Sequence, residues 1–83
     1  MSNKTIFIKD IVNNTQYELS VNVNLKISEL KIKIENTIGR KIMNKLCIKH
    51  KHRKVLTQLL DENLTIFEAH IKNEDIIILG KEI

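Results

Sequence analysis

The sequence predicts an α+β domain in which one helix packs across a mixed β-sheet. Three observations lead to this fold class. Two runs of alternating apolar and polar residues flank an Asn-Asn pair, a segment with helical spacing follows, and short apolar runs occupy the rest of the chain. The chain has 83 residues, of which 42% are hydrophobic and 29% are charged, so we expect a single globular domain at 1–83.

The first two elements are expected to form a β-hairpin. In residues 5–11, Ile6 and Ile8 share one face because side chains alternate along a strand. In residues 15–23, apolar residues alternate with polar ones in the same way. The Asn-Asn pair between the two runs tolerates the left-handed backbone conformation that hairpin turns need.

The third element is expected to be a helix over about 26–38. Its apolar residues recur at spacings of three and four, which places them on one helix face: Ile27, Leu30, Ile34 and Ile38. Gly39 follows the last of them and suits a left-handed C-cap. Asn24 or Ser28 is the expected N-cap, because Asn and Ser side chains accept hydrogen bonds from the first free N–H groups of a helix.

Short strands and turns are expected over the remainder. Residues 46–49 are typical of a short strand, and Val55-Leu56 of another, with a turn from His50 to Lys54 between them. The segment 60–71 has mixed apolar spacing and is expected to contain a short helical turn. A turn then leads into the last strand, Ile76 to Leu79.

One hydrophobic core is expected from the apolar faces of these elements. The chain has a single cysteine, so no internal disulfide can form and stability must come from apolar packing. The residues expected to be buried are Ile6, Ile8, Tyr17, Leu19, Val21, Ile27, Leu30, Ile34, Ile48, Leu60, Ile66, Ile71, Ile77 and Leu79.

Nothing in the sequence predicts export or membrane insertion. The longest apolar run, Ile76 to Leu79, is far shorter than the roughly 18 residues that a membrane span needs. The first residues lead directly into a strand-like segment, without the apolar stretch of a signal peptide. A single thiol fits a reducing compartment. We therefore expect a cytoplasmic protein with no transmembrane segment.

A basic segment lies between residues 40 and 54. It contains seven Lys or Arg residues and no acid, whereas residues 55–83 contain six acids and two Lys. One interpretation is a solvated loop that the acids of the domain balance, and the other is a docking surface for an anionic partner. The candidate basic patch consists of Lys45, Lys49, Lys51, Arg53 and Lys54.

Among anionic partners, an acidic protein or a membrane surface is favoured over nucleic acid. Each Lys or Arg near an anionic membrane contributes about 1 kcal/mol of attraction. Nucleic-acid binding would rely on phosphate contacts and would be sensitive to salt. The basic segment contains no aromatic residue that could stack on bases, so a basic nucleic-acid-binding module remains a lesser alternative.

Three residues of the basic segment raise the question of catalysis or metal binding. Cys47, His50 and His52 are residue types that serve as nucleophile, base or metal ligand. On a strand, however, Cys47 and His50 point to opposite faces, and no carboxylate between 40 and 54 is present to orient a histidine. We therefore expect a small sheet residue and two loop histidines, with no catalytic residue, metal or cofactor. His70 is also expected to be exposed.

The order and spacing of these elements resemble ubiquitin-like proteins of the β-grasp fold. Residues 6–9 are similar to the first strand of ubiquitin, 27–34 to its helix, and the apolar residues of 60–71 with the following acidic turn to its closing segment. A closer resemblance is to the YukD/EsaB family of bacterial type VII secretion systems. Its second-strand pattern of aromatic, acid, Leu, any residue and Val matches 17–21, followed six residues later by Ile27.

The chain departs from that family at several points. The family often has Pro after the second strand, where this chain has Asn22. It often has Gly before the acid of the final turn, where this chain has Glu74, and the region 50–58 is a few residues longer here.

The resemblance implies an interaction protein and not a conjugated modifier. Conjugation requires a tail ending in Gly-Gly, and the sequence has none. The resemblance places Ile11, Cys47 and Gly80 at the positions of ubiquitin's hydrophobic patch, where the small Cys and Gly side chains predict weak binding to ordinary ubiquitin receptors. Phe7, Ile11 and Cys47 form the candidate sheet face. The implied role is a non-enzymatic adaptor that binds a cytoplasmic domain of a membrane secretion component, and the alternative is a eukaryotic ubiquitin-like interaction domain.

Overall fold

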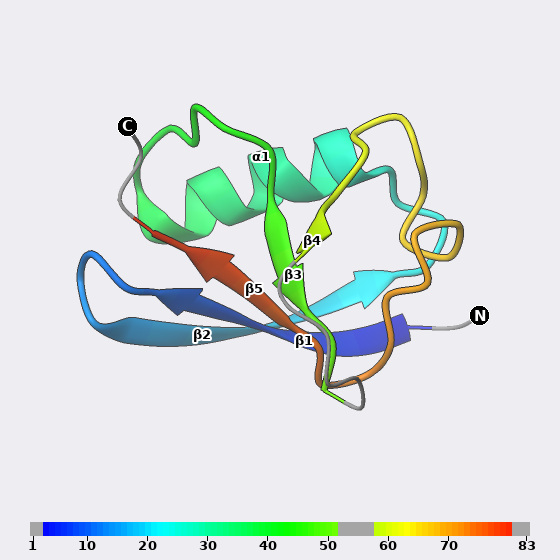
Figure 1. Ribbon diagram of the computed structural model, residues 1–83, viewed down its shortest axis with the longest axis horizontal. Coiled ribbons are helices and arrows are strands. Elements are labelled where there is room, and N and C mark those ends of the chain that lie inside the picture. The colour runs from blue at the N-terminus through cyan, green and yellow to red at the C-terminus, as the bar shows by residue number, and fades with distance from the viewer. Residues whose placement is uncertain (1–2, 52–57, 81–83) are drawn as a thin grey trace.

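The computed structural model describes residues 3–51 and 58–80, which form a five-stranded sheet and one helix (Figure 1). The elements are β1 (Asn3–Asp10), β2 (Thr15–Asn22), α1 (Ile27–Ile38), β3 (Cys47–Lys49), β4 (Gln58–Leu59) and β5 (Ile76–Leu79). The strand order is β2-β1-β5-β3-β4, in which β1 and β5 are parallel and the other neighbours are antiparallel. Because α1 crosses one face of this mixed sheet, the predicted α+β class is confirmed.

The predicted hairpin is present as β1 and β2. All eight residues of β1 pair in continuous register with the eight residues of β2. In the turn between them, Asn14 has a φ angle of 52°, the left-handed conformation that an asparagine tolerates well. The buried carboxylate of Asp10 accepts hydrogen bonds from the backbone N–H and the side-chain amide of Asn13, which fixes the start of the turn.

The predicted helix is also present, with a different N-cap. Lys26 is the N-cap in place of Asn24 or Ser28, and its backbone N–H donates to the side chain of Glu29 at 3.2 Å. Gly39 ends the helix as predicted, with a φ angle of 80° and its N–H bonded to the carbonyl four residues earlier. Within the described residues, no helix is long and apolar enough to cross a membrane.

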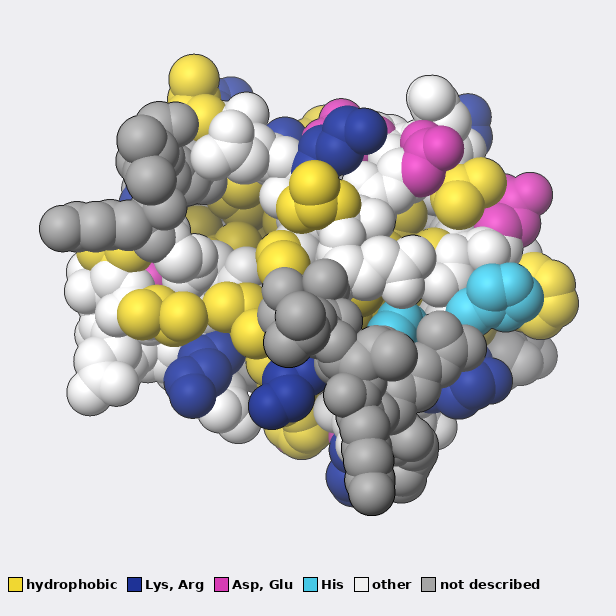
Figure 2. Space-filling view, in the orientation of Figure 1, with side chains coloured by type: hydrophobic (Ala, Val, Ile, Leu, Met, Phe, Trp, Pro, Cys, Tyr) yellow, Lys and Arg dark blue, Asp and Glu magenta, His cyan; other side chains and the backbone are white. Residues whose placement is uncertain are grey.

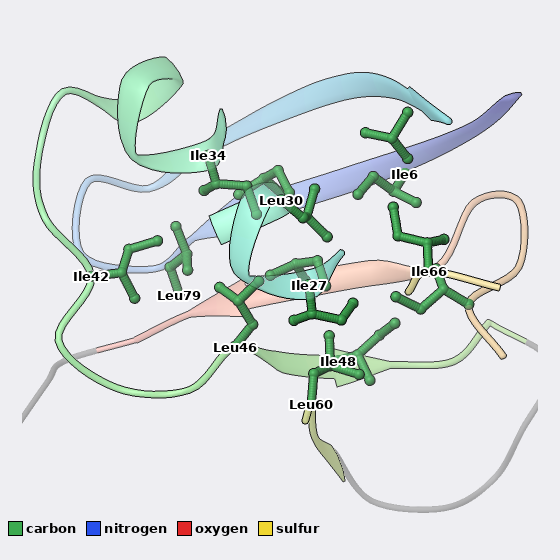
Figure 3. Packing of buried hydrophobic residues seen from close by; sticks show 14 residues of the cluster. Ile6, Ile27, Leu30, Ile34, Ile42, Leu46, Ile48, Leu60, Ile66 and Leu79 are labelled. Carbon is green, nitrogen blue, oxygen red and sulfur yellow. The ribbon is translucent and has the colours of Figure 1, made fainter. Parts of the chain in front are cut away.

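The core lies between α1 and the inner face of the sheet, and twelve of the fourteen predicted core residues are buried (Figure 3). The exceptions, Tyr17 and Leu19, are half-buried against the core, because their strand lies at the edge of the sheet. Ile42 and Leu46 are also buried, although neither was expected in the core, and both lie in the loop before β3. Figure 3 shows Ile42 beside Leu79 at one end of the core.

The chain after α1 differs in detail from the expectation. The strand that pairs with β3 is β4, whereas the expected strand at Val55-Leu56 lies outside the described residues. In the segment 60–71, the N–H of Ala69 donates to the carbonyl of Thr65, which closes the helical turn that was expected there.

Candidate interaction surface

The face of the sheet opposite α1 carries a group of apolar side chains. Successive residues of β1, β3 and β5 alternate between buried positions that face α1 and positions that face outward. We call the outward-facing apolar residues the outer-face cluster, which consists of Phe7, Cys47, Leu59, Ile76 and Ile78. Phe7 and Cys47 were predicted for this face, whereas the other three were missed. The predicted burial of Ile77 and Leu79 is confirmed, but which residues lie beside Ile76 and Ile78 on the outer face follows only from the pairing of β5 with β1 and β3.

Lysine side chains border the outer-face cluster. Lys9 lies opposite Ile78 in the β1–β5 register, and Lys49 lies opposite Ile76 in the β3–β5 register. Both lysines are exposed and have buried residues as chain neighbours, so they face outward with the cluster. Figure 2 shows hydrophobic side chains in a row on the molecular surface, with Lys or Arg side chains along one border. Lys49 of the candidate basic patch therefore adjoins Cys47 of the candidate sheet face on one surface.

The three positions that correspond to ubiquitin's hydrophobic patch lie at one end of this face. Ile11 is 55% exposed, and its N–H donates to the carbonyl of Leu79 at 2.8 Å, which places Ile11 beside Gly80. Cys47 and Gly80 line a shared hollow of about 190 Å³. Ile78 lines the same hollow, so the surface keeps apolar contact area although Gly80 has no side chain.

Two cations of the basic segment are paired inside the domain. The guanidinium of Arg40 bonds both oxygens of the buried Asp10, at 3.1 and 3.3 Å. This bidentate pair fastens the loop after α1 to the end of β1. The ammonium of Lys51 contacts the carboxylate of Glu74, and both side chains are about half exposed. The acids of the domain therefore balance part of the basic segment, as the solvated-loop interpretation expected.

The remaining described members of the candidate basic patch are free to meet a partner. Among the residues that the structure describes, Lys45 and Lys49 have no carboxylate within 4 Å, and both are exposed. Lys45 lines the same hollow as Cys47. Arg53 and Lys54 lie outside the described residues. Lys45 and Lys49 are thus the cations that the structure places at the outer-face cluster.

His50 lies in the loop that follows β3, as expected, but its side chain is buried. It is only 6% exposed, and its Nδ1 lies 2.8 Å from Asp75 Oδ2. Asp75 is 1% exposed and also accepts hydrogen bonds from the backbone N–H groups of Lys51 and Lys72, each at 2.9 Å. The carboxylate that orients His50 comes from outside 40–54. It belongs to Asp75, in the turn before β5.

Among the described residues, the structure does not bring Cys47 together with His50 or His70 in a reactive group. Cys47 faces outward and His50 faces inward, as the strand alternation predicts. His52 lies outside the described residues, and His70 is exposed as expected. Across residues 3–51 and 58–80, no group of three or more His, Cys, Asp or Glu side chains is arranged to hold a metal ion.

Comparisons with known proteins show the fold. No family model matches the chain, and no curated protein sequence matches it. Among solved structures, the C-terminal ubiquitin-like domain of mouse tubulin-specific chaperone e is similar to this chain, with a TM-score of 0.78 and 11% identity over 96% of this chain and 87% of that one. The C-terminal ubiquitin-like domain of the human 2'-5'-oligoadenylate synthetase-like protein has a TM-score of 0.72 and 25% identity over 98% and 85%.

An archaeal ubiquitin has the same architecture. The ubiquitin of Caldiarchaeum subterraneum has a TM-score of 0.71 and 17% identity over 99% of this chain and 96% of that chain. Together with the observed strand order and the crossing helix, these similarities show that the chain has a ubiquitin-like β-grasp fold.

Proposed function

We propose that this chain is a non-conjugated ubiquitin-like adaptor that binds a protein partner through the outer-face cluster and its bordering lysines. The observation that carries the proposal is the convergence of two independently predicted surfaces. The apolar residues around Cys47 and the unpaired cations Lys45 and Lys49 adjoin on one side of the sheet. Interfaces commonly combine an apolar centre with a polar rim, and this arrangement has both.

The chemistry of this surface specifies an acidic partner with apolar anchor residues. Glu18, opposite Phe7 in the β1–β2 register, is the only acid among the outward-facing strand residues that the structure describes. Lys9, Lys45 and Lys49 lie around the apolar residues, so an acidic segment meets complementary charge. The hollow beside Cys47 offers room for one small apolar side chain of the partner.

The resemblance to the YukD/EsaB family indicates in which cellular system this partner acts. In our proposal the adaptor works in the cytoplasm, where it binds an acidic cytoplasmic domain of a membrane component of a type VII secretion system. Gene context separates this role from a eukaryotic ubiquitin-like interaction domain. The secretion role requires genes for the secretion ATPase and its substrates beside the gene of this chain.

A pulldown with a charge-matched control tests the proposal. Lys45→Glu with Lys49→Glu reverses the cations at the outer-face cluster, and Lys26→Glu with Lys33→Glu makes the same charge change on the helix layer. Cytoplasmic domains of the neighbouring secretion components are the baits, at low and high salt. We expect the outer-face variant to lose binding and the helix variant to retain it.

The comparison of low and high salt adds a second criterion for binding through the lysines. Charges on an exposed surface are screened over about 8 Å at physiological ionic strength, so wild-type binding should weaken as salt rises. Equal recovery of the wild type and both variants at both salt concentrations contradicts the proposed surface. Recovery on anionic lipid vesicles without any recovery on the protein baits replaces the protein partner with a membrane surface.

A further inference from the structure

The free side of β2 lacks the features that usually protect the edge of a sheet. β2 is an edge strand of eight residues, and it pairs with β1 in continuous register without a bulge. Natural edges are commonly shortened, bulged or supplied with lysines, which prevents pairing with another chain. The chain contains fourteen Lys and Arg residues, yet none lies in β2, whose single charged residue is Glu18. The opposite edge, β4, has only two residues.

The core-facing side of this strand is incompletely covered. Tyr17 and Leu19 point to the same side of the sheet as α1 and pack against the core, but both are only partly buried. A further strand beside β2 would cover their remaining apolar surface. Within the described residues, the edge from Thr15 to Val21 therefore offers both backbone groups without a strand partner and apolar area to an incoming strand.

We propose that β2 pairs antiparallel with β2 of a second copy of this chain, about a twofold axis at Leu19. Residues directly opposite each other in an antiparallel pair have side chains on the same face of the sheet. The twofold axis must therefore pass through a residue of β2 and not between two residues. In two registers almost every residue of β2 has a partner in the second copy, and these registers are centred on Glu18 and on Leu19. The first places two Glu18 carboxylates against each other, which is unfavourable.

The Leu19 register matches residue types across the interface. Tyr17 lies opposite Val21 of the second copy, an aromatic and β-branched pair that favours strand association. Glu18 lies opposite Ser20 of the second copy, so no like charges are in direct opposition. The dimer is a continuous sheet of ten strands, five from each copy, with both helices on one side. Both outer-face clusters then lie on the other side of the sheet.

A charge swap at Ser20 tests this register. Ser20 is exposed and faces away from the core, so substitution there should leave the monomer stable. Ser20→Glu places a second carboxylate opposite each Glu18, while Ser20→Lys places an opposite charge there. The dissociation constant of the full chain is measured by sedimentation equilibrium, and urea unfolding checks the stability of each variant. We expect Ser20→Glu to weaken dimerisation about tenfold and Ser20→Lys to strengthen it.

A double variant makes the test specific. Glu18→Lys combined with Ser20→Glu restores opposite charges at the same two positions, so it should recover dimerisation that Ser20→Glu alone loses. Wild-type protein that stays monomeric up to about 1 mM overturns the proposal. Equal dimerisation of the two Ser20 single variants also overturns it, because the dimer then uses another surface. These outcomes concern only the β2 edge, so they are independent of what the outer-face cluster binds.

Discussion

At the scale of single residues, the buried polar groups of this small domain hold its segments together. The carboxylate of Asp75 accepts three hydrogen bonds, from the His50 imidazole and from the backbone N–H groups of Lys51 and Lys72. It thereby ties the end of β3 to the turn before β5. Asp10 does the same at the other end of the sheet through its pair with Arg40. Within the described residues, no buried side-chain nitrogen or oxygen lacks a partner.

We expect substitution of this polar network to destabilise the fold. Asp75→Asn keeps the shape of the side chain but places an NH₂ group where an oxygen accepts a hydrogen bond, so a backbone N–H loses its acceptor. His50→Ala removes the imidazole, which is one of the three hydrogen-bond donors to Asp75. Each should lower the free energy of unfolding by about 1–3 kcal/mol, measured by urea denaturation.

His70 supplies the matched control for this network. It is exposed and has a φ angle of 58°, so His70→Asn replaces it with another residue that tolerates this conformation. The control should change the free energy of unfolding by less than about 0.5 kcal/mol. If His50→Ala and His70→Asn unfold at the same urea concentration, the polar network does not stabilise the domain.

At the scale of elements, the hairpin, the helix, β3 and β5 could be predicted, whereas β4 could not. β2 alternates over eight residues and α1 shows four apolar residues at helical spacing, so each pattern repeats enough times to be specific. β3 and β5 were expected as short apolar strands at 46–49 and at Ile76 to Leu79, whereas β4 has only two residues and contains no repeating pattern. β4 is positioned by its pairing with β3, which is tertiary information.

We expect the buried face of α1 to dominate the stability of the helix layer. Leu30 is fully buried, so Leu30→Ala should lower the free energy of unfolding by about 2–5 kcal/mol. Ile32 lies on the same helix but is 57% exposed, so Ile32→Ala should lower the free energy of unfolding far less. Thermal melts of both variants check this, and similar melting temperatures would mean that the helix face is misassigned.

The C-terminal end of the helix depends on one backbone conformation. Gly39 has a φ angle of 80°, and a Cβ atom there would meet no other atom within 4 Å. Gly39→Ala should therefore destabilise the domain through backbone strain alone, by about 1–2 kcal/mol. Gly80 also has open space but does not have a left-handed φ angle, so Gly80→Ala is the control and should be nearly neutral in urea unfolding. Equal losses of unfolding free energy in Gly39→Ala and Gly80→Ala would contradict the assignment of Gly39 as a left-handed cap.

At the scale of the whole molecule, the proposed interaction surface arises from register. Phe7 and Cys47 could be predicted for the sheet face because each belongs to a recognisable strand. The predicted burial of Ile77 and Leu79 implies that Ile76 and Ile78 point outward, but only the pairing of β5 with β1 and β3 shows that they lie beside Phe7 and Cys47. The same pairing places Lys49 beside the apolar residues.

A chemical-shift titration tests the central claim that the outer-face cluster is the binding surface. The ¹⁵N-labelled full chain is titrated with the cytoplasmic domain of a neighbouring secretion component. We expect the largest changes at the amides of Cys47, Lys49, Ile76 and Ile78, with little change along the exposed side of α1 around Ile32. Changes concentrated around Ile32, with the amides of β3 and β5 unmoved, would contradict the account.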